Sequence, residues 1–435
     1  MTLAPARPAA TAPVASTGAV PPVVTAVLVS RLDPVGAGEA LRALLTQTLL
    51  PDEVLVVDRT RGAALPPGPA GEARPAAGPS ARDADDPPDA DGTDDTDDDA
   101  AADDDAAPDE APGPAPVAPV TLADVVATVA EHSPVPVTVV EASPRIPVRR
   151  AVHAAVAAHP PLGEAPALLW FVPVGSTPEQ RTLGALVDAW RRSPSAGLLG
   201  PKHLDAASPN RLRALAIRAT RGGRLLPRPV PGEPDQGQYD RMTDALAVPF
   251  AGTLVERDLL LGLGGWESSF GDVGADLDLG WRAQAAGRRV VVVPGARMRT
   301  EPGVAVATAA TAPRRRAARR VALARAPWWS TPFLAAWIVV TSVLAALGLL
   351  LLKRPRSAWA ELSAVTSIEP VRGLRARWRT RHARVVRRRH LRSLFEPRRA
   401  VLTGWADSVH HALVPPRPPI GDQVGDLNPR SWLVK

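Results

Sequence analysis

Short, nearly all-apolar runs alternate with amphipathic stretches in the first part of the chain. Val23–Val29 and 53–57 are rich in β-branched residues, which is typical of strands buried on both faces of a sheet. Between them, 39–48 carries leucines at helical spacing, and Pro51 ends that helix. This order predicts a strand–helix–strand unit with a right-handed crossover, and therefore a parallel sheet.

The same alternation returns after residue 120. It predicts helices at 122–131, 148–158, 177–192 and 276–286, strands at 137–141, 167–172, 198–201, 245–255 and 289–293, and a hairpin within 212–229. We therefore expect one α/β domain over 21–300, built on a mostly parallel sheet with helices on both faces.

Composition interrupts this domain. Residues 61–118 consist mainly of Ala, Pro, Gly and Asp, with fifteen acidic residues from Asp83 to Glu110. Repulsion between like charges and the shortage of apolar side chains predict a disordered insertion. A calcium loop is the alternative, but the central Gly and closing Glu of such a loop are missing. Residues 1–20 lack the apolar core of a signal peptide and are predicted to be a disordered tail.

The C-terminal third has a different pattern. A basic linker is expected at 301–330, followed by a membrane-associated helix at 331–353, because 333–352 is free of charge and long enough to span about 30 Å. A buried core helix is the alternative. Both flanks are basic, so the positive-inside rule does not choose an orientation. A helix lying in the interface, or a re-entrant turn, would satisfy both flanks.

The C-terminal region at 354–435 is rich in arginine, above all at 372–399. These arginines fit anionic lipid headgroups, and beside an apolar helix lipid is the more economical partner. Nucleic acid phosphates would attract the same charges, but no recognised nucleic-acid fold accompanies them. The chain has no cysteine, which excludes disulfides and thiolate metal sites and is typical of a reducing compartment.

One stretch carries the most specific pattern, AGTLVERDLLLGLGGWESSFGDVGADLDLGWR at 251–282. It resembles the acceptor-side segment of family-two glycosyltransferases, with LGG and an aromatic residue before an acidic (E/D)D-x-D-L-x-x-R motif. The first strand–helix–strand unit resembles the nucleotide-binding unit of that family. SPSAGLLGPKHLD and EPDQGQYD resemble a subgroup of large, membrane-attached actinobacterial glycosyltransferases.

The resemblance implies a GT-A fold and an inverting sugar transfer from a UDP- or dTDP-sugar. Asp276 would be the general base that takes the proton of the acceptor hydroxyl. Asp58, at the end of the second strand, would contact the nucleotide. The acceptor side would be shaped by Gly265, Trp266, Asp278, Trp281 and Arg282. The structural alternatives are that Asp276 caps a helix and that Asp58 is a turn residue.

Other positions depart from the family pattern. The resemblance implies a paired-aspartate metal motif where this chain has Val174 and Gly175, and a histidine ligand where it has Thr300. None of the three matches the carboxylate and imidazole ligands that the family places there, so a divalent metal is doubtful. Arg297 and Arg299 lie near the missing histidine and would supply positive charge to the diphosphate, or would be ordinary surface arginines.

Two functions follow from these expectations. The first is a membrane-attached glycosyltransferase on the cytoplasmic side of the cell membrane, acting on a cell-envelope glycan or lipid-linked acceptor. The second is a catalytically degenerate pseudoenzyme that scaffolds or regulates a partner glycosyltransferase or membrane subunit. A third, which ranks last, is a protein whose function lies in its basic tail, bound to membrane or nucleic acid.

Overall fold

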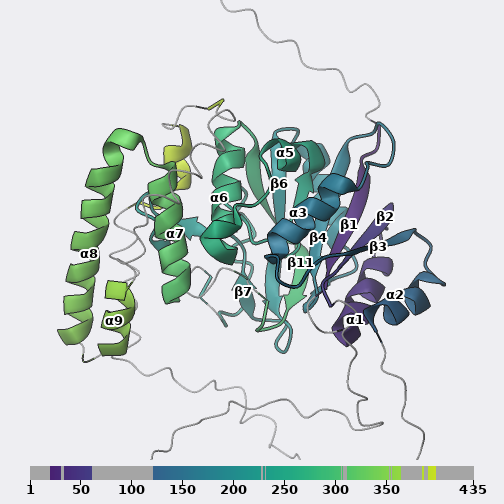
Figure 1. Cartoon of the computed structure of the whole chain (residues 1–435), viewed down its shortest axis with the longest axis horizontal. Coiled ribbons are helices and arrows are strands. Elements are labelled where there is room, and N and C mark those ends of the chain that lie inside the picture. The colour runs from purple at the N-terminus through teal and green to yellow at the C-terminus, as the bar shows by residue number, and fades with distance from the viewer. Residues whose placement is uncertain are drawn as a thin grey trace, which may run out of the picture.

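The computed structural model describes residues 20–30, 34–60, 121–226, 229–230, 232–304, 306, 311–351, 353, 355–363, 385–386 and 390–397 (Figure 1). The predicted insertion at 61–118 and all but the last residue of the predicted N-terminal tail lie outside the described residues. Most of the Arg-rich region at 354–435 also lies outside them.

The sheet runs in the order β3, β2, β1, β4, β10, β6, β11, β5, with β7 paired to β6. Its first four strands are parallel, as are β6 and β11, while β10 and β5 run antiparallel to their neighbours. The predicted mostly parallel α/β sheet is confirmed. The strand bounds are β1 Val23–Val29, β2 Glu53–Asp58, β3 Val137–Glu141, β4 Ala167–Pro173, β5 Ser176–Pro178, β6 Ala196–Asp205, β7 Leu212–Ala214, β10 Leu254–Glu256 and β11 Arg289–Thr300.

Helices cover both faces of this sheet, as predicted. Successive side chains of β1 point to opposite faces, so Val27 and Val29 enter one core while Ala26 and Leu28 enter the other. The first core lies under α3 (Val148–Ala158), α5 (Arg257–Gly262) and α6 (Gly271–Ala285). The second lies under α1 (Pro34–Leu45), α2 (Leu122–Ala130) and α4 (Thr182–Arg192).

Several boundaries differ from the predicted ones. The strand expected at 245–255 is only β10, and the strand expected to end at 293 continues as β11 to Thr300. A register irregularity between Val293 and Arg297 lets the strand pass Pro294 and Gly295 and pair again. The short β5 was not predicted, because it exists only through its long-range pairing with the end of β11. The predicted hairpin appears as β8 (Arg218–Ala219) with β9 (Leu225–Leu226).

A helical layer stands beside the α/β domain. It comprises α7 (Ala312–Arg325), α8 (Thr331–Leu351) and α9 (Pro355–Ser363), with α8 at the left edge of the view in Figure 1. The stretch at 301–330, expected as a basic linker, thus contains a helix, and α7 packs against α6. Within the described part of the chain, one helix, Trp328–Leu351, is long and apolar enough to cross a membrane.

Candidate functional site

The carboxyl ends of five strands meet at one edge of the sheet. Since β10 is antiparallel to both β4 and β6, β6 and β11 point in the same direction as β1, β2 and β4. Ligands of open α/β sheets bind beyond the carboxyl ends of the strands. The predicted nucleotide residue Asp58 and the predicted metal positions all lie at this edge.

The three positions at which the resemblance implies metal ligands lie beside one another. Ser176 on β5 pairs with Thr300 at the end of β11, and the backbone N–H of Glu301 donates to the carbonyl of Gly175 at 2.9 Å. The family resemblance implies that Val174 and Gly175 should meet Thr300 in space. The structure therefore brings together two segments that the sequence separates by more than a hundred residues.

These residues do not fit a divalent cation. Val174 is buried and apolar, Gly175 has no side chain, and the Thr300 hydroxyl is fully buried 3.0 Å from Nδ1 of His203. One carboxylate lies close by, that of Glu301, whose Oε2 would be 3.0 Å from a Cβ placed on Gly175. Among the described residues no group of three His, Asp or Glu is arranged to hold a metal ion.

Neutral polar side chains occupy this end of the site. Ser176, His203 and Thr300 are each 0% exposed. Burial, helped by the charge of Arg213, lowers the pKa of His203 to about 3, so the imidazole is neutral at physiological pH. His203 lies in the stretch SPSAGLLGPKHLD, but that pattern does not place it beside Thr300, because this contact depends on the pairing of β6 with β11.

Asp58 stabilises the turn that follows β2. Its Oδ1 accepts hydrogen bonds from the backbone N–H and the hydroxyl of Thr60, at 2.7 and 2.8 Å. The next residue, Arg59, donates to the carbonyls of Pro144 and Ile146 and so ties the tip of β2 to the loop before α3. The turn role considered for Asp58 is thus present in the structure, and it places the carboxylate at the predicted nucleotide edge.

Asp276 is buried on α6 in a two-pronged ion pair with Arg149, the second residue of α3. Arg149 Nε and Nη2 donate to the two carboxylate oxygens at 2.8 Å each, and the backbone N–H of Phe250 donates to Oδ2 at 3.1 Å. Arg149 also pairs with Asp272 and lies over the Phe250 ring. Burial raises the pKa of the Asp276 carboxyl, although the charge of Arg149 opposes that shift.

Asp278 and Arg282, both predicted at the acceptor side, form a buried ion pair within α6. The Asp278 carboxylate accepts from Arg282 Nε at 2.7 Å and from Arg325 Nε of α7 at 2.6 Å. Arg282 donates its other N–H groups to the carbonyls of Leu263 and Gly265, at 2.6 Å each. Burial alone would raise the pKa of Asp278, but the two arginines outweigh it and hold that pKa below its usual value.

The Leu-Gly-Gly turn held by Arg282 borders a cavity of about 330 Å³. Its lining comes from α3, from the turn and the residues that follow it, and from α6: Arg150, His153, Leu263, Gly264, Gly265, Trp266, Glu267, Ser268 and Arg282. Gly265 has φ near 70°, and a Cβ there would lie 2.2 Å from the His153 ring, so a side chain does not fit. Trp266 packs edge-on against Phe171 and Phe250 and anchors the turn in the core.

Trp281 does not line this cavity. Its ring contacts Phe395 of the C-terminal segment at 4.6 Å between ring centroids. Phe395 and Leu391 are buried against this side of α6, and Glu396 pairs with Arg218 of β8. The predicted acceptor residues therefore separate into Gly265, Trp266 and Arg282 at the cavity and Trp281 at a different surface of α6.

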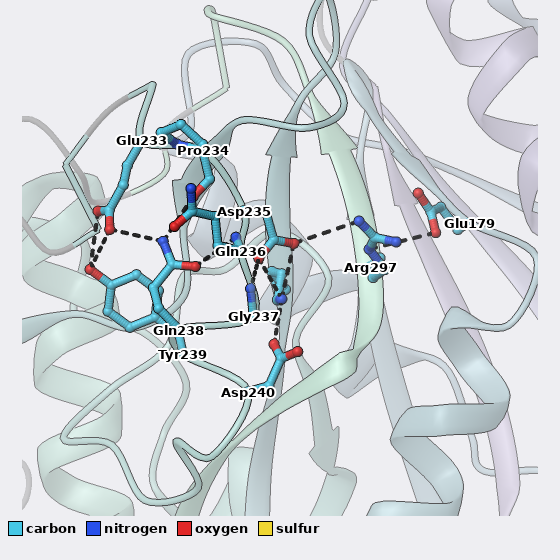
Figure 2. Close-up of polar contacts among 11 residues, drawn as sticks. Glu179, Glu233, Pro234, Asp235, Gln236, Gly237, Gln238, Tyr239, Asp240 and Arg297 are labelled. Atoms are coloured by element: carbon cyan, nitrogen blue, oxygen red, sulfur yellow. Dashed lines mark hydrogen bonds and ion pairs between the residues drawn. The ribbon is translucent and has the colours of Figure 1, made fainter.

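Arg297 and Arg299 both lie near the end of β11, with side chains 42% and 51% exposed. Both approach Glu179 at 3.9 Å. Arg297 also approaches Asp235 at 3.6 Å, and Figure 2 shows Arg297 between these two carboxylates. At 3.6 to 3.9 Å these are looser contacts than the buried pairs of α6. Both arginines therefore remain partly open to a ligand at the strand ends.

A buried lysine, Lys202, contacts the same Asp235 that Arg297 approaches. The sequence pattern predicted no role for this lysine. Lys202 Nζ lies 3.0 Å from both carboxylate oxygens of Asp235 and 2.5 Å from Asp240. Lys202 belongs to the stretch SPSAGLLGPKHLD, and the two aspartates belong to EPDQGQYD. Both stretches were part of the resemblance. Their opposite charges could have suggested that they contact each other, as they do.

No family model and no curated protein matches the sequence. Among solved structures, the chain is similar to a Pyrobaculum calidifontis mannosyltransferase in complex with GDP-Man and Mn2+, at 15% identity and TM-score 0.41, covering 92% of this chain and 91% of that one. It is also similar to GalNAc-T7 with UDP, GalNAc and Mn2+, at 11% identity and TM-score 0.41, covering 69% and 47% of the two chains, about half the length of GalNAc-T7.

A third similarity is to S. aureus TarS 1–349, at 11% identity and TM-score 0.34, covering 72% of this chain and 68% of that one. All three TM-scores fall below 0.5, where similarity carries no argument about the chain.

Proposed function

We propose that this protein is a membrane-attached glycosyltransferase with a GT-A-like fold, acting at the cytoplasmic side of the cell membrane. It would transfer a sugar from a UDP- or dTDP-sugar to a cell-envelope glycan or lipid-linked acceptor. The observation that carries this proposal is the meeting of Gly175–Ser176 with Thr300–Glu301 at the carboxyl edge of the sheet. The family resemblance, which was found in the sequence alone, predicts that these two segments lie together.

The chemical step assigns one task to Asp276. Its carboxylate takes the proton of the acceptor hydroxyl while the hydroxyl oxygen bonds to the anomeric carbon. The bond between that carbon and the diphosphate breaks, and the nucleoside diphosphate leaves with the electron pair. Both oxygens of Asp276 are engaged in the structure, so the step requires Arg149 to release one of them when substrates bind. The raised pKa of Asp276 favours its role as a proton acceptor.

The departing diphosphate needs positive charge. The residues at the ligand positions implied by the resemblance do not fit a metal ion, so side chains would supply this charge. Arg297 and Arg299 are partly exposed cations at the end of β11, and their contacts with Glu179 are long enough to yield to a phosphate oxygen.

Calorimetric titration of the detergent-solubilised chain with UDP and dTDP, in Mn²⁺ and in EDTA, tests this proposal. We expect one nucleotide to bind equally well in both buffers, and Arg297→Ala with Arg299→Ala to weaken binding about tenfold or more. Asp188→Ala, which removes an exposed pair with Arg191, is the matched control and should change nothing. Absence of binding by both nucleotides at millimolar concentration would contradict the proposal.

A second candidate is the catalytically degenerate scaffold or regulator of a partner enzyme. It is favoured by the environment of Asp276, where Arg149 compensates the base candidate within a buried pair. Turnover measured with the nucleotide-sugar that binds separates the two functions. The transferase predicts loss of about 10²-fold or more in kcat for Asp276→Asn. Binding with no turnover in the unaltered protein would favour the scaffold.

A further inference from the structure

Helix α8 presents two faces of different exposure. Ile338, Ser342 and Ala346, spaced four residues apart, are buried against the neighbouring helices. The opposite face is apolar and exposed along its whole length: Phe333, Trp337, Val340, Leu344, Leu347 and Leu351. Their spacing of three and four residues puts them in one stripe, on the side of the helix opposite Ser342. A stripe of large apolar side chains facing water marks a surface that something apolar covers.

Both ends of α8 are held beside the α/β domain. Near its start, Leu334 lies against the hairpin turn at Gly222. After its end the chain turns back as α9, which packs on α8 and carries Glu361 to α7. There the Glu361 carboxylate, 2% exposed, accepts hydrogen bonds from Arg315, at 2.6 Å, and Arg319. In Figure 1, α7 and α9 accordingly lie between α8 and the domain.

This arrangement conflicts with a helix that crosses a bilayer. A crossing α8 would carry α9 and the α7 ion cluster to the same depth, because they lie along its inner face. Ionised side chains at the centre of a bilayer are costly, and α7 is packed in turn on α6 of the α/β domain. A helix lying along the membrane surface keeps the ion cluster in water and still removes the apolar stripe from it.

We propose that α8 lies flat in the interface of an anionic membrane, with its exposed stripe in the acyl boundary. This deepens the membrane attachment in the proposed function and does not depend on sugar transfer. Trp328, Trp329 and Trp359 are all exposed and suit the headgroup level. Residues 312–363 contain nine Arg or Lys and one acidic residue, Glu361. Arg315 and Arg319 pair with Glu361, and Arg325 pairs with Asp278, so it is the six other cations whose charge matches anionic headgroups.

Single cysteines test the orientation, since the chain has none of its own. Phe333→Cys, Leu344→Cys and Leu351→Cys mark the start, middle and end of the stripe, and Ala346→Cys marks the buried face. Each is labelled with bimane, and quenching by spin-labelled lipids reports depth. We expect the three stripe positions to lie at one shallow depth and Ala346 to be quenched several-fold less. A deep Leu344 between shallow Phe333 and Leu351 would overturn the proposal in favour of a crossing helix.

Sidedness gives an independent readout. An impermeant maleimide added outside vesicles should label Lys353→Cys and Asp188→Cys, on α4, equally in chains bound from outside. Protection of one of the two sites in intact vesicles would contradict the flat orientation. Both positions are exposed, so these variants are expected to fold.

Flotation with vesicles of phosphatidylglycerol or phosphatidylcholine tests the lipid class. We expect binding to the anionic vesicles, lost in Leu344→Glu/Leu347→Glu and reduced about tenfold without anionic lipid. Val139→Glu, at an exposed apolar position on β3, is the matched control and should float normally.

A chain that binds nucleotide but floats with neither vesicle would overturn this inference and the membrane attachment while leaving the transferase proposal standing. Equal binding to both vesicles would overturn the anionic part.

Discussion

At the α6 end of the candidate site the acidic residues of the family pattern, Asp276 and Asp278, are present, and each is matched by buried arginines. At the strand-tip end the charged groups of the pattern are absent, and the neutral side chains of Ser176, His203 and Thr300 fill the space. The first end holds buried charges that compensate one another, whereas the buried side chains of Ser176, His203 and Thr300 at the second end are uncharged.

The difference shows what each end requires for folding. A buried carboxylate is costly unless cations pair it, and at the α6 end such ion pairs join α3, α6 and α7. The strand-tip end has no such requirement at Ser176, His203 and Thr300, because these buried side chains are uncharged. The variants below test this contrast from the largest expected effect to the smallest.

Asp278→Ala should have the largest effect on stability. It leaves Arg282 and Arg325 buried without their shared carboxylate, and breaking a buried ion pair costs up to about 5 kcal/mol. Urea unfolding followed by circular dichroism measures the loss. Asp188→Ala, at an exposed pair on α4, should cost no more than about 0.5 kcal/mol. Equal losses in the two variants would show that the ion pairs of Asp278 with Arg282 and Arg325 do not stabilise the fold.

Arg149→Met and Asp276→Asn should each cost about 3 kcal/mol, less than Asp278→Ala because the pair has a single arginine. In the double variant both charges are gone, so its loss should be smaller than the sum of the single losses by about 2 kcal/mol. The same urea titrations complete the cycle. Additive losses would mean that Arg149 and Asp276 are not coupled, and that the base candidate is free of its arginine in solution.

Acidification should lower the stability of the protein through the strand-tip end, because His203 is buried there in its neutral form. His203 takes up a proton near pH 6.5 when unfolded but only near pH 3 when folded. Between these values the unfolded chain binds more protons, so this contribution is complete above pH 6.5 and is lost as the pH falls. From pH 7.5 to 5.5 the free energy of unfolding should drop by about 1.4 kcal/mol on this account.

His203→Asn removes that titration while leaving an oxygen that can meet the Thr300 hydroxyl. The pKa of His153 is also lowered, by burial and by Arg282, and acts in the same direction. The readout is therefore the difference between the two proteins over this pH range. If the variant and the unaltered protein lose stability in parallel, the neutral cluster at the strand tips does not control the acid response.

Much of the α/β fold could be predicted from residue pattern alone. The β-branched runs at Val23–Val29 and Glu53–Asp58 bury residues on both faces, and a parallel sheet between helices is the arrangement that accommodates them. The pattern failed where a strand depended on a distant partner, as in β5 and the last residues of β11. It also failed for α7. The many arginines of this segment predict a solvated linker, and only the folded structure shows that Asp278 and Glu361 pair with them.

Residue identity alone determined that Val174 and Gly175 offer no side-chain oxygen to a ligand, wherever the fold places them. Tertiary structure decided what the charged residues do. Arg149 stands 127 positions before Asp276, and no local pattern links them. Burial and pairing are properties of neighbours in space, so the sequence could name Asp276, Asp278 and Trp281, but only the packing of α3, α7 and the C-terminal segment on α6 chose their partners.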